Sequence, residues 1–96
     1  DTCLLSQQAA EKYLKGYLVS QGIEPKRTHN LPALLKECVK IDQSFREIDE
    51  ESKFLTRFYE PARYPNAVIE LDFPKKSGEK ALQAAEKIIN FIKNKL

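Results

Sequence analysis

The residues best suited to chemistry lie in the segment YEPARYPN, residues 59–66, where an arginine stands between two tyrosines and two prolines. A guanidinium presents a planar fork of N–H donors that matches a phosphate. Arg63 could therefore hold a phosphate. It could also do no more than finish a helix, by meeting the last free carbonyl groups or by pairing with Glu60 or Glu70. The local sequence leaves both interpretations open.

His29 is the single histidine of the chain. Histidine can exchange a proton near neutral pH, so His29 could serve as a general base or acid. It could equally make local capping bonds beside Thr28 and Asn30, because the sequence identifies no partner for it. One histidine and two cysteines without a CxxC spacing do not form an apparent zinc site, and the three isolated glycines exclude a phosphate loop. We therefore expect neither a metal nor a cofactor.

A further set of polar side chains lies in the segment SQQAAEKYLKGYL. Its amide and ammonium donors share one flank of a predicted helix and could contact phosphates or bases. These donors are Gln7, Gln8, Lys12 and Lys15. Glu11 and Lys15 also have the four-residue spacing of an exposed ion pair, so the alternative is a solvated helix face.

The elements that position these residues are predicted to be α-helices, because apolar residues recur at steps of three and four in every long segment. The expected helices span about residues 2–21, 31–41, 45–63 and 78–95. Gly22 is expected to end the first helix. Asn30 and Ser77 are the expected N-caps of the second and last helices. Ser44 and Glu47 form a possible capping box for the third, with Asp49 as a competing cap that would start this helix later or break it.

The apolar positions of these helices predict a shared core and an all-α, up-and-down four-helix bundle formed by residues 1–96 as a single domain. Residues 64–77 form the one long connection, which could be partly extended. The predicted core positions are Cys3, Ala10, Tyr13, Leu14, Tyr17, Leu18, Leu31, Leu34, Leu35, Cys38, Ile41, Phe45, Ile48, Ser52, Leu55, Tyr59, Ala62, Ala81, Ala85, Ile88, Ile89, Ile92 and Leu96. On the first helix, Gln7, Glu11, Lys12 and Lys15 are expected to point away from the core.

The composition of the 96 residues, 42% hydrophobic and 31% charged, fits one small domain whose stability is marginal unless a partner covers one face. The net charge of +2 is too balanced to predict nucleic-acid binding by bulk charge. No apolar run could cross a membrane and no leader is recognisable, so we expect a cytoplasmic protein without a membrane partner and with reduced, buried cysteines. The chain has no methionine and begins with Asp1, so we expect a further segment upstream.

Four blocks, SQQAAEKYLKGYL, THNLPALL, YEPARYPNA and KALQAAEKIINFI, together resemble the HEPN domain, the higher eukaryote and prokaryote nucleotide-binding family. The resemblance covers essentially the whole chain. It implies a helical bundle that commonly forms a homodimer, with one more helix before the first block.

The resemblance implies two functional branches. Many HEPN proteins are metal-independent ribonucleases, often toxins paired with a nucleotidyltransferase antitoxin, and they carry an arginine followed after four to six residues by a histidine. Arg63 matches this arginine. The corresponding later positions hold Val68, Ile69 and Glu70, so the ribonuclease branch lacks its base unless His29 replaces it.

The other branch, with RYP and no following histidine, is associated with nucleotide or nucleic-acid binding beside a small nucleotidyltransferase. It implies that Arg63 contacts phosphate, that Tyr59 or Tyr64 stacks on a base or orders the arginine, and that Asn66 bonds a base edge or caps a turn. The expected ligand-binding residues are Arg63, Tyr64, Asn66, Lys12, Gln8 and His29. A third possibility is a purely structural bundle in which the first and last helices form a dimer seam.

Overall fold

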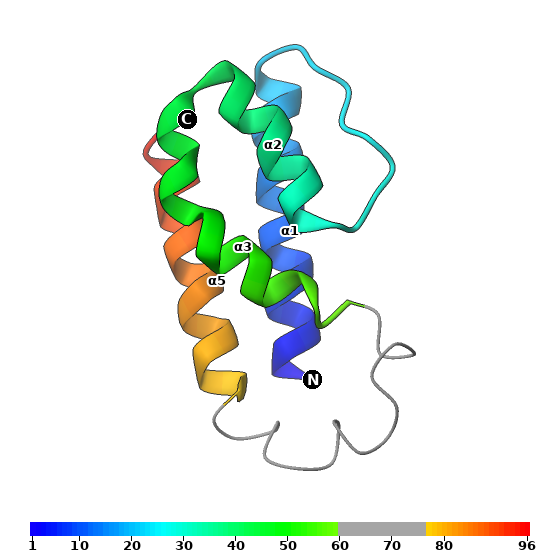
Figure 1. Ribbon diagram of the computed structural model, residues 1–96, viewed down its shortest axis with the longest axis vertical. Helices are drawn as coiled ribbons and strands as arrows, with labels where there is room; N and C mark the ends of the chain where they lie inside the picture. Colours follow the sequence, from blue (N-terminus) through cyan, green and yellow to red (C-terminus); the bar gives the residue numbers. More distant parts are fainter. Residues whose placement is uncertain (60–76) are drawn as a thin grey trace.

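The computed structural model describes residues 1–59 and 77–96. These ranges contain helices α1 (Thr2–Ser20), α2 (Leu31–Ile41), α3 (Asp49–Thr56) and α5 (Gly78–Lys93), and the 3-10 helix η1 (Gln43–Ile48), as Figure 1 shows. No strand occurs in the described ranges. The predicted all-α helical bundle is therefore confirmed.

Helices α1 and α5 lie side by side and run in the same direction (Figure 1). At one end a β-carbon added at Gly78 would lie 3.8 Å from Cβ of Thr2. At the other end the Phe45 ring joins the two helices, with its centroid 4.5 Å from that of Tyr17 and 5.0 Å from that of Phe91. The pair of helices forms the base on which the rest of the chain packs.

The remaining elements cover one side of this base. Helix α2 runs along α1, and its Cys38 thiol donates to the carbonyl of Leu14 at 3.9 Å. The η1–α3 segment then runs back in the opposite direction, from Phe45 beside Tyr17 towards Thr56, whose Oγ1 accepts from the amide of Leu31 at 3.0 Å. This return brings the end of α3 to the start of α2.

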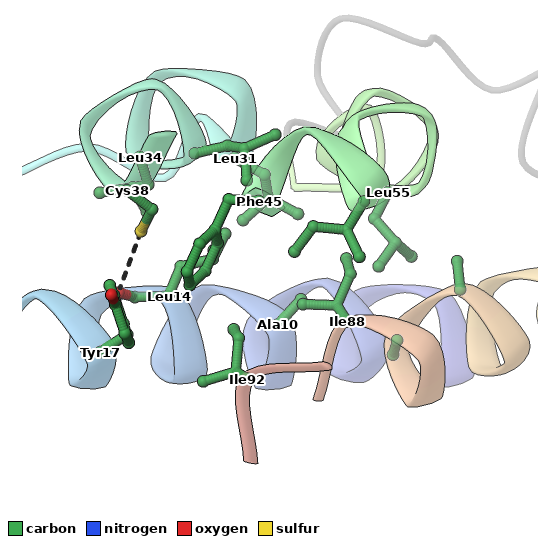
Figure 2. Packing of buried hydrophobic residues seen from close by; sticks show 14 of the residues in the cluster. Ala10, Leu14, Tyr17, Leu31, Leu34, Cys38, Phe45, Leu55, Ile88 and Ile92 are labelled. Carbon is green, nitrogen blue, oxygen red and sulfur yellow. Dashed lines mark hydrogen bonds between the residues drawn. The ribbon is translucent and has the colours of Figure 1, made fainter. Parts of the chain in front are cut away.

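The core between the two layers contains side chains from every described helix, as Figure 2 shows. Leu14, Leu34, Phe45, Leu55 and Ile88 are all fully buried there. Burying such a side chain contributes roughly 1.5–3 kcal/mol, so contacts between elements hold the bundle together more than helix propensity does.

Both cysteines are buried and free, as expected. Burial raises the pKa of the Cys38 thiol to about 12. Because only the thiolate is reactive, Cys38 is a core residue and not a nucleophile.

Two predicted helix ends are confirmed. Asn30 caps α2, with its side chain accepting from the amide of Ala33 at 2.9 Å. Gly22 follows α1 with a φ of 79°, a left-handed conformation that glycine adopts without a steric penalty. The start of α1 is capped by Asp1, whose carboxylate accepts from the amides of Cys3 and Leu4.

The predicted start and the predicted end of the third helix are both wrong. Asp42 accepts from both the amide and the hydroxyl of Ser44, so Asp42 and not Ser44 is the cap, and the chain opens with η1 before α3 starts at Asp49. The alternative of a broken or late-starting helix is therefore the correct one. Helix α3 ends at Thr56, so it does not reach Arg63 as one continuous helix.

The last predicted helix has the correct start, but Ser77 makes no side-chain capping bond. Ile41 and Leu96, both predicted for the core, are exposed. Each lies at or beyond the end of its helix. The described helices include none that is both long enough and apolar enough to cross a membrane.

Candidate functional site

His29 lies against the middle of α1 and pairs with Glu11. Its Nδ1 is 2.9 Å from Oε2 and 3.1 Å from Oε1 of that carboxylate. An ionised carboxylate can only accept hydrogen bonds, so Nδ1 carries a proton. The other ring nitrogen, Nε2, has no hydrogen-bond partner among residues 1–59 and 77–96.

Glu11 is only 8% exposed, although it is charged. Nζ of Lys15 donates to its Oε2 at 2.9 Å, and Nε2 of Gln7 donates to its Oε1 at 3.4 Å. Burial acts to raise the pKa of Glu11, but the hydrogen bonds from Lys15 and His29 outweigh it and the pKa is lowered. Glu11 therefore stays ionised at neutral pH and holds the imidazole in one orientation.

Gln7 fixes the backbone beside the imidazole. Its side chain is fully buried, and its Nε2 donates to the carbonyl of His29 at 3.0 Å. Its Oε1 has no partner in the described part of the chain. A buried amide that bonds a backbone 22 residues away ties the segment before α2 to α1.

Tyr59 closes the site from the end of α3. Its ring stacks on that of His29, with centroids 4.0 Å apart and an angle of 19° between the planes. The bond from the Leu31 amide to Thr56 holds the same two segments together. Three elements far apart in the sequence therefore fix one imidazole, while half of the His29 side chain, 50%, remains exposed.

We call Gln7, Glu11, Lys15, His29 and Tyr59 the His29 cluster. The charges of ionised Glu11 and Lys15 cancel. The net charge of the cluster therefore depends on whether the imidazole of His29 carries a second proton. Neutral His29 presents a proton acceptor at Nε2, and protonated His29 presents a donor on a cation. The arrangement can therefore accept a proton or hold an anion.

The predicted site residues divide into three groups. His29 has the long-range partners described above, so local capping is not its role; the Asn30 side chain caps α2 and the Asn30 amide donates to Thr28 Oγ1. Gln8 and Lys12 are exposed on α1 and do not belong to the cluster, so their contact with a ligand stays a prediction. Arg63, Tyr64 and Asn66 lie outside the described residues.

Gln7 and Glu11 were predicted to lie on the outer side of the first helix, which is wrong because both are buried. The ion pair of Glu11 with Lys15 is likewise partly buried instead of exposed. The sequence does contain a signal for these contacts. Gln7, Glu11 and Lys15 are spaced four residues apart, which aligns the three polar side chains on one strip of a helix. No group of three or more possible metal ligands gathers in the described ranges.

A family model, the HEPN domain, matches residues 1–95. The chain belongs to the HEPN domain family. No curated protein and no solved structure matches it. For this HEPN domain, the family membership indicates a function related to nucleotides or RNA.

Proposed function

We propose that this HEPN domain binds a nucleotide or RNA as the accessory of a small nucleotidyltransferase. Arg63 holds a phosphate, and the His29 cluster forms the neighbouring part of the same site. The observation that carries the proposal is the half-exposed imidazole of His29, fixed through Nδ1 by buried Glu11 and stacked on Tyr59. This imidazole therefore combines a fixed position with a ring nitrogen, Nε2, that has no hydrogen-bond partner in the described part of the chain.

The sequence around the cluster supports this assignment. Arg63 and Tyr64 follow Tyr59 by four and five positions, and Asn66 follows two positions later. In the proposed site Tyr64 stacks on a base or orders Arg63, and Asn66 bonds a base edge. Gln8 and Lys12, exposed on α1, extend the donors available to the backbone of an RNA.

The proposal is tested by titrating the protein with ATP and with short RNA at two salt concentrations. We expect binding that weakens with added salt, and a loss of about tenfold or more in Arg63→Ala, because an arginine on a phosphate makes charge-assisted bonds. Lys93→Gln, which removes a positive charge from α5, is the matched control. Unchanged affinity in Arg63→Ala removes Arg63 from the site, and no binding of either ligand rejects the function.

A second candidate is metal-independent cleavage of RNA, with Arg63 and a displaced base. The pairing of His29 Nδ1 with Glu11 favours it, because a carboxylate-oriented imidazole is a competent acceptor for the proton of a 2′-hydroxyl. The purified protein should then cut RNA to products with 2′,3′-cyclic phosphate ends, and both Arg63→Ala and His29→Ala should lose this activity. Intact RNA in the presence of measured binding rejects the second candidate and leaves the first.

We also propose that the domain forms a homodimer in the cytoplasm and works within a toxin–antitoxin pair with the nucleotidyltransferase. Support for the homodimer comes from large exposed apolar side chains on and after α1 and α5. These side chains are Leu5, Val19, Leu82 and Leu96. Co-purification of this protein with a nucleotidyltransferase encoded by a neighbouring gene tests the pairing, and purification of each protein alone from cells that express both would contradict it.

A further inference from the structure

We infer that the His29 cluster is a proton-controlled phosphate site, in which the Nε2–H of protonated His29 donates directly to a phosphate oxygen of the ligand. The inference rests on the proposed function and adds to it the atom that meets the phosphate and the condition under which it does so.

The geometry restricts where the controlling proton can lie. Nδ1 of His29 is committed to Glu11 at 2.9 Å, and the carboxylate requires a proton on Nδ1 whether the ring is neutral or charged. A second proton must therefore enter at Nε2. The nitrogen that gains the proton is thus the one that has no partner in the described residues, and without that proton Nε2 presents a lone pair to an anion.

The charges around the ring reinforce this control. The groups that face His29 in the described structure are Glu11 on α1, Lys15 through the same carboxylate, and Tyr59 after α3. Glu11 and Lys15 sum to zero, so the cluster is neutral with a neutral ring and carries one positive charge with a protonated ring. An anion consequently gains a net attraction only in the protonated state.

The ring is also held ready for a ligand. Gln7 bonds the backbone carbonyl of His29, and Tyr59 covers one face of the ring at 4.0 Å. Little motion of the ring remains to be lost when a phosphate binds, which lowers the entropic cost of binding. Half of the side chain is exposed, so the site is open at the surface.

The phosphate can come from the diester backbone of RNA or from a mononucleotide, since both offer the same acceptor oxygens. The first arm of the test uses an RNA of about six nucleotides without terminal phosphates. The charge of its diesters stays constant between about pH 5.5 and 7.5, so any change of affinity in this range comes from the protein. AMP forms the second arm. Tighter binding of the RNA assigns the site to backbone diesters, tighter binding of AMP assigns it to terminal phosphates, and either result supports a phosphate site.

For the RNA we expect affinity to fall as pH rises, approaching about tenfold per pH unit once the imidazole is neutral. In His29→Gln this pH dependence should vanish, and the affinity at the lowest pH should drop to about the level that the unmodified protein shows at the highest pH. Glu11→Gln keeps an acceptor for Nδ1 but leaves the positive charge of Lys15 without its partner. Its binding at the highest pH should therefore be tighter than that of the unmodified protein, whereas a merely structural loss would weaken binding equally at every pH.

The single histidine makes the decisive readout direct. In protein with ¹⁵N-labelled histidine, saturating RNA at the lowest pH should shift the Nε2 resonance and keep this nitrogen protonated to higher pH than in the free protein. Lys93→Gln, a charge change on α5 outside the cluster, should leave the pH dependence intact. Binding that is independent of pH, or that His29→Gln does not weaken, overturns this inference and leaves the proposed function standing. Absence of binding at every pH overturns both.

Discussion

Glu11 is the residue on which the His29 cluster depends. A buried carboxylate is costly unless its oxygens are bonded, and here Lys15, Gln7 and His29 supply the donors. The bond from His29 orients the imidazole, and the bonds from Lys15 and His29 lower the pKa of Glu11. The residue therefore serves the stability of the fold and the chemistry of the site through one set of contacts.

The lowered pKa of Glu11 predicts an acid-sensitive contribution to stability. The folded state favours the carboxylate, so this contribution is fully present above the pKa of Glu11 in the unfolded chain, about 4.3. It is lost as the pH falls through the lower pKa that Glu11 has in the folded protein. Urea unfolding at neutral and acid pH should show a smaller loss on acidification in Glu11→Gln than in the unmodified protein. The exposed Glu24→Gln serves as control, and a Glu11→Gln variant with the unmodified acid dependence would contradict the prediction.

Residue types alone identified His29 as a candidate but could not find its partner. The contact between Glu11 and His29 spans 18 residues and exists only after the segment before α2 folds back along α1. The burial of Gln7 was not predicted, for a related reason. A glutamine on a helix is normally solvated, and the burial of Gln7 depends on its bonds to Glu11 and to the backbone carbonyl of His29.

The elements that position the site were predicted best where the signals are local. Thr2–Ser20 and Gly78–Lys93 follow from long apolar periodicity, and the start of α2 follows from Asn30. The η1–α3 segment was predicted less well, because Asp42 competes with Ser44 for the cap and because Phe45 packs between Tyr17 and Phe91. Tertiary contacts thus determine this segment more than its own periodicity does.

The two predicted N-caps differ in their bonds and should differ in energy. Asn30 accepts from the Ala33 amide, whereas Ser77 makes no side-chain capping bond. We expect Asn30→Ala to lower the free energy of unfolding by about 1 kcal/mol, and Ser77→Ala to change it by no more than a few tenths. Urea unfolding of the two variants provides the comparison, and equal losses would show that the Asn30 bond is not formed in solution.

Within residues 1–59 and 77–96, the most exposed large apolar side chains lie on and after α1 and α5, the pair of helices that forms the base of the bundle (Figure 1). If the proposed homodimer buries these side chains, Leu82→Glu should shift the protein to monomers while its helical content stays unchanged, because Leu82 is already 48% exposed. Light scattering after size exclusion measures this shift. Lys53→Glu on α3 is the control, and a Leu82→Glu protein that remains dimeric would exclude this seam.

At the scale of the whole molecule, we propose that His29 and Arg63 contact one ligand in one site. The most direct measurement is a double-mutant cycle on the affinity for RNA, with His29→Ala, Arg63→Ala and the double variant. Residues that share a ligand couple by about 0.5–3 kcal/mol, so we predict that each single variant binds more weakly and that the double variant loses less than the sum. Strictly additive losses, or a single variant with unchanged affinity, would contradict the claim.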